Sequence, residues 1–452
     1  MKHESEALLN RPILDSFENK YSRPAAFCVF FFPALGGLLF GFDIGATSSV
    51  VAQLKSSTNS GVKWHQEVED SSFLQGFIAA IGLVGAMVGS IVCFQIADQL
   101  GRRLTLRIAS VLFAVGAEIE FLAGLPMLES QAGISVLMLG RLVYGLGCGF
   151  AMHGAPAYIG EMSPSAIRGR LVALKEAFVV LGILLGYSIG FANENTVGGW
   201  RWTYASAVPF AVVLLGGLLY IPDSARWLAL RGRDEEAAAA MRWVNSHVPD
   251  SAVRDIQQSA NEAAAEANEG SVWTRLTSAA TWPALVAGVG VVFLQQVTGQ
   301  PSVLYFANSI FVDVGLSTVA SIGVSAFKLV ATVASTVAVD KYGRRVLLLT
   351  GCTLMLIALL MLGTAFLFPY TGAQDCHGIS VEASCPDTCS WQSTCGESCE
   401  AAGFDPSDCT CCDVSGINLQ KGFVLGSMFL YIGGYQVGFG PIAWLLIAEI
   451  FP

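Results

Sequence analysis

The chain has 452 residues, of which 53% are hydrophobic and 13% are charged, and its net charge is −10. Because an average soluble protein carries roughly 25% charged residues, this composition excludes a soluble globular protein and indicates one that lies mostly in a lipid bilayer. The net charge identifies no partner, since the orientation of a membrane protein depends on Lys and Arg rather than on net charge. We expect no nucleic-acid partner.

The first segment, residues 1–24, is polar and has no short apolar core before a cleavage site, so we expect a cytosolic tail rather than a signal peptide. Its Glu4, Leu8 and Leu9 fit an acidic dileucine signal, which clathrin adaptors read on endosomal and vacuolar proteins. Short strings of this kind also arise by chance.

Long apolar stretches follow, and a membrane-spanning helix needs about 20 apolar residues. Ten such spans are predicted, with centres near residues 38, 84, 115, 144, 182, 211, 298, 329, 357 and 435. Six spans make residues 25–221 and four make residues 283–452, while the polar, Ala-rich residues 222–282 are expected to be a helical cytosolic linker. Two charged turns, Asp98–Arg103 and Asp340–Arg345, occupy corresponding places in the two parts. This duplication indicates a secondary transporter.

Basic residues crowd one set of alternate loops, the set that contains both charged turns and the linker. The opposite loops hold few basic residues: Lys55, Lys63, Arg201 and Lys421. By the positive-inside rule, the basic side is cytosolic, together with the N-terminus.

Two ionisable residues fall in the middle of spans, where such groups are costly and usually functional. Asp43 lies in the first span and Arg141 in the fourth. Burial disfavours an ionised carboxylate and a neighbouring guanidinium favours it, so an aspartate under both influences can gain and lose a proton as access to it changes. Two interpretations stay open, namely proton coupling and a static ion pair that only joins two helices.

A second set of ionisable residues consists of Glu176 in the fifth span and Lys328 in the eighth. They either pair across a central cavity between the halves or lie apart, with Glu176 at the cytosolic boundary and Lys328 extended towards the membrane interface. Glu118 and Glu120 are expected near the far end of the third span, solvated and without a role.

The seventh span is interrupted by amides, a Gly and a Pro in residues 295–301. Broken helices are tolerated in membranes where they line a cavity. Gln295 and Gln296 offer amides suited to hydroxyl groups, and Tyr305 and Trp444 add aromatic faces, which together are the usual chemistry of a sugar site. Hydrogen bonds between helices would use the amides equally well.

Small residues within spans indicate packing. Gly145–Gly149 favours close helix contact rather than a nucleotide-binding loop, because no strand precedes it. Four cysteines inside spans are also most simply packing residues: Cys28, Cys93, Cys148 and Cys352.

The remaining eight cysteines crowd into one non-cytosolic loop, residues 370–418. They are Cys376, Cys385, Cys389, Cys395, Cys399, Cys409, Cys411 and Cys412. An oxidising compartment favours up to four disulfides. Zinc is the alternative, although only His377 accompanies the cysteines, and we predict no metal site.

Several motifs resemble those of the sugar porter family of the major facilitator superfamily. They are the two charged turns, Pro156–Pro164, Pro222–Leu228 and Gly440–Glu449. The segments Phe32–Gly37 and Thr298–Tyr305 resemble the branch of plant vacuolar glucose transporters and D-xylose–proton symporter-like proteins. The resemblance implies an all-α membrane protein of two pseudo-symmetric helical bundles. About ten of its twelve transmembrane helices lie in this chain, so we expect two further spans beyond it.

The resemblance also implies roles for individual residues. Asp43 matches the proton-coupling aspartate of sugar–proton symporters, and Arg141 matches its partner. The residues at substrate-contact positions are Gln295, Gln296, Tyr305, Trp444, Glu176, Lys328 and Gln436. Some depart from the family: Glu176 replaces Gln, Lys328 replaces Asn, Gln436 stands where facilitative relatives carry Glu, and Pro301 replaces a sugar-binding Asn. A cytosolic charge network that stabilises the outward-open state corresponds to Asp98, Arg102, Arg103, Glu161, Arg168, Asp340, Arg344, Arg345 and Glu449.

Together these features predict a monomeric transporter that moves a hexose or pentose by alternating access, with protons as the coupling ion and no other cofactor. A facilitative uniporter and a non-transporting sugar sensor are the alternatives. No nucleophile–base set or metal cluster indicates an enzyme. The dileucine string and the branch resemblance favour the vacuolar membrane over the plasma membrane.

Overall fold

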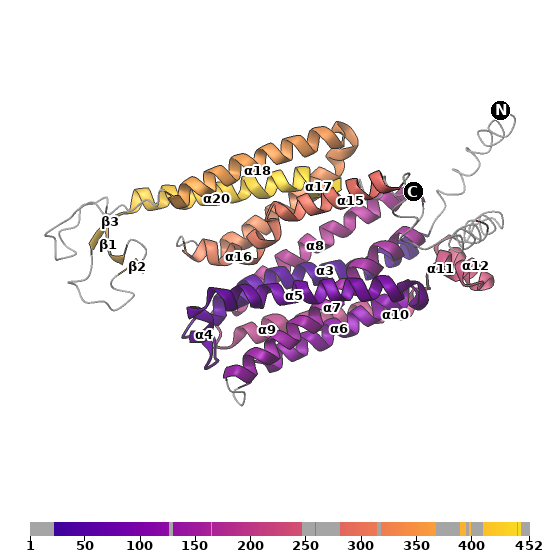
Figure 1. Ribbon diagram of the computed structural model, residues 1–452, viewed down its shortest axis with the longest axis horizontal. Helices are drawn as coiled ribbons and strands as arrows, with labels where there is room; N and C mark the ends of the chain where they lie inside the picture. Colours follow the sequence, from indigo (N-terminus) through magenta and orange to yellow (C-terminus); the bar gives the residue numbers. More distant parts are fainter. Residues whose placement is uncertain are drawn as a thin grey trace. The chain divides into compact units, whose positions relative to one another are not determined.

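The computed structural model of the chain (Figure 1) describes residues 22–125, 130–163, 165–245, 258, 281–313, 318–367, 389–394, 397–398, 410–440 and 442–443. Contacts divide the chain into two compact units, Met1–Pro301 with Ala443–Pro452 and Ser302–Ile442. The predicted dileucine string, Trp444 and Glu449 lie outside the described residues.

Helices make up nearly all of the described chain. Those of the first unit are α3 (Arg23–Leu54), α4 (His65–Asp70), α5 (Ser72–Leu100), α6 (Arg102–Leu122), α7 (Ser130–Met162), α8 (Ser165–Asn193), α9 (Gly199–Ala205), α10 (Ala207–Tyr220), α11 (Ala225–Leu230), α12 (Asp234–Val244) and α15 (Trp282–Val297). The others are α16 (Gln300–Asp313), α17 (Val319–Tyr342), α18 (Arg344–Leu367) and α20 (Val414–Gly438).

Nine of the ten predicted span centres lie inside these helices, and the one near residue 298 lies at the break between α15 and α16. Within the described residues, eight segments are long and apolar enough to cross a membrane. Helix α6 is not one of them, because it carries arginines in its first two turns and two glutamates near its end.

Helix α3 is buried along most of its length and packs against α7, α8 and α10 in the first unit. Glycines bring α5 and α7 into close contact. A Cβ on Gly145 would collide with the backbone of Gly82, and one on Gly149 would lie 2.5 Å from the carbonyl oxygen of Ala86. Small residues at helix contacts let backbones approach in this way. The predicted packing role of Gly145–Gly149 is therefore confirmed.

Each of the two charged turns contains a glycine with a positive φ angle. Gly101, between α5 and α6, has φ +83°, and Gly343, between α17 and α18, has φ +79°. Only glycine adopts this left-handed region without strain, so each turn can reverse the chain within a few residues. The correspondence that the sequence predicts between these turns holds in their backbone.

The polar linker contains short helices, as its composition predicts. Helix α12 begins with three acidic residues, Asp234, Glu235 and Glu236, and has Arg242 in its last turn. This arrangement complements the helix dipole.

In the second unit, helix α18 packs closely on α20, where Gly351 faces Gly434 and Gly438.

One segment of this unit departs from the predicted all-α fold. The Cys-rich loop before α20 forms a small antiparallel sheet of β1 (Cys389–Thr394), β2 (Glu397–Ser398) and β3 (Thr410–Asp413), in the order β2-β1-β3. The side chains of the loop cysteines lie outside the described residues, so their disulfides stay a prediction.

Candidate functional site in the first helical unit

The structure brings Asp43 of α3 and Arg141 of α7 together in a buried ion pair. Arg141 donates from Nη1 to Oδ1 of Asp43 and from Nη2 to Oδ2, the latter at 3.1 Å. Its Nε donates to the carbonyl oxygen of Ile78 on α5 at 3.2 Å. Arg141 is fully buried and Asp43 is 5% exposed. The two-pronged geometry matches the planar guanidinium to the carboxylate, and it joins three helices through one side chain.

Neighbouring groups fix the orientation of this pair. A Cβ on Gly82 would lie only 2.8 Å from Nη2 of Arg141, so the absence of a side chain there makes room for the guanidinium. The ring of Tyr204 on α9 lies below it, with its centroid 5.6 Å from Cζ of Arg141. Tyr144 donates a hydrogen bond to the carbonyl oxygen of Leu39 at 2.9 Å and thereby ties α7 to α3.

Glu120 joins the same cluster, and the expectation that it is solvated is wrong. Its side chain is 1% exposed, and its Oε1 lies 3.7 Å from Nη1 of Arg141. Glu118 does lie exposed, as expected. The signal for Glu120 was its helical phase, because it follows the buried Phe113 and Ala117 at intervals of seven and three residues and so shares their face of α6.

The residues predicted to contact substrate divide into buried and exposed positions. Gln295 on α15 is buried and Gln296 is exposed. The helix breaks where the sequence predicts, with Gly299 at φ +81° between α15 and α16. Tyr305, on α16, is buried. Glu176, on α8, is half-buried.

A second polar cluster lies between α17 and α20. Gln436 donates to Oγ1 of Thr332, and the Thr332 hydroxyl donates to the carbonyl oxygen of Lys328 at 2.7 Å. Nζ of Lys328 lies 5.8 Å from the centroid of the Tyr435 ring. Lys328 therefore does not extend towards a membrane surface within this unit, since it is only 3% exposed. The predicted pair of Lys328 and Glu176 would join the two units and stays a prediction.

At the first charged turn, three of the residues predicted for the charge network form ion pairs with one another. Arg102 pairs with Asp98 at 2.9 Å and with Glu161 at 3.1 Å. Ser224, which caps α11, donates its hydroxyl to Glu161. Arg103 instead donates to the carbonyl oxygen of Leu218 at 2.7 Å.

The remaining members of the network are only partly described. Arg344 is half-buried and Arg345 is exposed. The side chains of Arg168, Asp340 and Glu449 lie outside the described residues.

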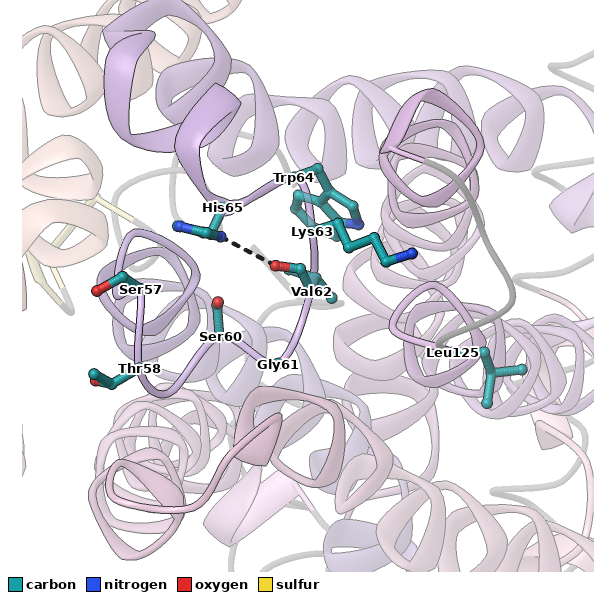
Figure 2. A pocket seen from close by; sticks show the side chains of 9 residues that line it. All are labelled: Ser57, Thr58, Ser60, Gly61, Val62, Lys63, Trp64, His65 and Leu125. Atoms are coloured by element: carbon teal, nitrogen blue, oxygen red, sulfur yellow. Dashed lines mark hydrogen bonds between the residues drawn. The ribbon is translucent and has the colours of Figure 1, made fainter.

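One polar pocket of about 300 Å³ lies in the loop between α3 and α4 (Figure 2). Its lining comprises Ser57, Thr58, Ser60, Gly61, Val62, Lys63, Trp64, His65 and Leu125. Nδ1 of His65 is engaged with the carbonyl oxygen of Val62 at 3.1 Å. Because none of the predicted site residues lines it, this pocket is distinct from the ion-pair cluster.

Comparisons with known proteins agree with this arrangement. A family model described as "Sugar (and other) transporter" matches residues 29–382. The chain belongs to this sugar transporter family. It is 38% identical over 452 residues to D-xylose-proton symporter-like 1 of Arabidopsis thaliana, and the match covers 96% of this chain and 77% of the relative.

Solved structures place this family member in the major facilitator superfamily fold. The partially occluded, inward-open xylose transporter XylE from E. coli matches with a TM-score of 0.71 and 26% identity, covering 95% of this chain and 86% of that one. The proton:xylose symporter XylE bound to 6-bromo-6-deoxy-D-glucose matches with a TM-score of 0.70 and 27% identity, covering 96% and 83%. The predicted resemblance and fold are thus confirmed. This superfamily consists of transporters rather than enzymes.

Proposed function

We propose that this sugar transporter family member moves a monosaccharide, a hexose or pentose, together with a proton by alternating access. The observation that carries the proposal is the buried, two-pronged pair of Asp43 and Arg141 in the middle of α3 and α7. Ionisable residues inside membrane helices usually mark ion pathways. The names of the relatives, a D-xylose-proton symporter-like protein and a proton:xylose symporter, support the same coupling ion and substrate class.

Asp43 serves this function by binding either Arg141 or a proton. While it is ionised, it holds the guanidinium of Arg141, which bridges α3, α7 and α5. A proton on Asp43 removes the charge that holds Arg141, so proton binding weakens the contact between these helices. A change in helix packing of this kind can switch the side from which the cavity is reached. For the sugar itself, we expect hydrogen bonds from its hydroxyl groups to the amides of Gln295, Gln296 and Gln436. We expect its ring faces to pack on the aromatic rings of Tyr305 and Trp444.

The test is transport by the purified protein in proteoliposomes. Asp43→Asn should abolish sugar accumulation driven by a proton gradient and leave sugar exchange across the membrane intact. Asp70→Asn is the matched control, because Asp70 is exposed at the end of α4. A wild-type protein that equilibrates sugar without accumulating it would identify a uniporter and refute the coupling.

We place the charged turns and the N-terminus on the cytosolic side, with the vacuolar membrane as the location and a monomer as the working form. Support comes from the bias of basic residues to one set of loops and from Glu4, Leu8 and Leu9, a candidate signal for clathrin adaptors. Protease protection of an N-terminal tag in isolated vacuoles tests both the side and the membrane. A tag protected from external protease would contradict the orientation.

A further inference from the structure

Glu120 is a buried carboxylate that lies beside the pair of Asp43 and Arg141, within ion-pair distance of Arg141. Its Oε1 lies 3.7 Å from Nη1 of Arg141, beyond hydrogen-bonding distance, and within the described part of the chain neither of its oxygens has a hydrogen-bond partner. Three of the five N–H groups of Arg141 donate elsewhere, one from each of Nη1 and Nη2 to Asp43 and that of Nε to Ile78. A buried carboxylate that accepts no hydrogen bond is unfavourable when it is ionised.

The charges of the cluster do not balance unless one proton is present. Two carboxyl groups face one guanidinium, so ionisation of both acids would leave a buried negative charge, which is costly. Asp43 holds both terminal nitrogens of Arg141 and is therefore the ionised acid. We propose that Glu120 is a second carboxyl group of the proton site and that it carries the proton while Asp43 is paired with Arg141. This inference rests on the proposed proton coupling.

Other titratable groups around Glu120 do not change this balance. Asp43 faces it from α3, Tyr204 from α9, and Arg141, Tyr144 and Cys148 from α7. Arg141 is the one cation in that group, and tyrosine and cysteine are neutral when they are protonated.

The second carboxyl group gives Arg141 an alternative partner. When Arg141 turns from Asp43 towards Glu120, the O–H bond of Glu120 breaks and an O–H bond forms on Asp43. In this step the proton moves between the two acids and the guanidinium exchanges one carboxylate for the other, so the net charge of the cluster does not change. Asp43 can therefore be protonated without leaving the charge of Arg141 unpaired in the membrane interior.

Infrared spectroscopy of the purified full chain tests where the proton lies, because a protonated carboxyl group has a C=O stretching band that a carboxylate lacks. Glu120→Gln should remove one such band, whereas the matched Glu118→Gln, two residues away on the exposed face, should retain it. A band that persists in Glu120→Gln overturns the proposal. If that variant does not fold, Glu120→Asp should shift the band, and an unshifted band overturns the proposal equally.

Transport by the same variants separates this inference from the proposed function. Glu120→Gln should lower gradient-driven accumulation by at least about tenfold, equivalent to about 1.4 kcal/mol, and leave sugar exchange intact, while Glu118→Gln should match the wild type. If Asp43→Asn loses accumulation and Glu120→Gln does not, this inference alone fails. If the wild type does not accumulate sugar, the proposed coupling fails, and the infrared result still decides whether Glu120 is protonated.

Discussion

Asp43 and Arg141 are stable in the interior of the bundle only because their geometry offsets the cost of removing both charges from water. Two contacts join the guanidinium to the carboxylate, and a third joins it to the carbonyl oxygen of Ile78. Breaking a buried pair by removing one partner costs about 3–5 kcal/mol. The position of Arg141 is therefore tightly constrained, and Gly82 provides the space for it.

We predict that Gly82→Ala displaces the guanidinium, because the new methyl group would lie 2.8 Å from Nη2 of Arg141. Overpacking of this kind costs about 1–3 kcal/mol, so the unfolding temperature and proton-driven accumulation should both fall. Gly76→Ala is the control on the same helix, since nothing lies within 4 Å of its Cβ position. That control should retain wild-type transport. Equal behaviour of the two variants would show that the space beside Arg141 is not critical.

At the scale of elements, side chains at the first charged turn connect the ends of several helices. Arg102 begins α6 and reaches Glu161 near the end of α7, while Glu161 accepts the hydroxyl of Ser224, the residue that caps α11. The side chains of Arg102 and Glu161 are 16% and 14% exposed. A charged hydrogen-bond network that is mostly shielded from water contributes more than an ion pair on the surface.

Glu161→Gln should therefore destabilise the first unit, because it removes the charge that Arg102 and Ser224 share. A hydrogen bond to a charged group contributes about 1.5–3 kcal/mol, and thermal unfolding in detergent should show the loss as a lower Tm. Glu235→Gln, on the exposed first turn of α12, should change stability by less than about 0.5 kcal/mol. A Tm for Glu161→Gln within error of that control would show that the network does not contribute to stability.

At the scale of the whole chain, two compact helical units are joined near a broken helix, and a small sheet interrupts the second unit. The sheet pairs β1 with β3 in a backbone register that matches Trp391 with Cys411 and Ser390 with Cys412. A short sheet of this size has little apolar surface to bury and needs an additional constraint. Disulfides among the loop cysteines would provide it.

Counting reactive thiols tests that prediction. The chain has 12 cysteines, and the four whose side chains the structure describes are free: Cys28, Cys93, Cys148 and Cys352. In denaturing detergent without reductant, a maleimide should therefore label about four sites per chain, and after reduction it should label all 12. Twelve labels without reductant would refute the disulfides. Zinc binding would then be the remaining hypothesis, because denaturing detergent releases the metal and exposes the thiols.

Local features of the sequence were sufficient to predict the parts of the structure that depend on hydropathy and residue chemistry. Span positions follow from apolar length, the interruption near Gly299 follows from its flanking amides and proline, and the pairing of Asp43 with Arg141 follows from two charges in apolar surroundings. Of the cysteines predicted to pack, Cys93 and Cys148 are buried, Cys28 is half-buried and Cys352 is exposed. Which way a residue faces is the part that hydropathy leaves open.

The sequence by itself determined that the chain crosses a membrane repeatedly, that it is duplicated, and that an acid and a base lie within its spans, because each of these depends on composition along a short segment. Only the tertiary structure decided that Glu120 lies beside Arg141 while Glu118 faces outward. The physical reason is that the rotation of α6 is set by its packing on α7, where Gly140 permits contact with Glu120. A difference of two residues on a helix is enough to move a carboxyl group from solvent or lipid into the interior.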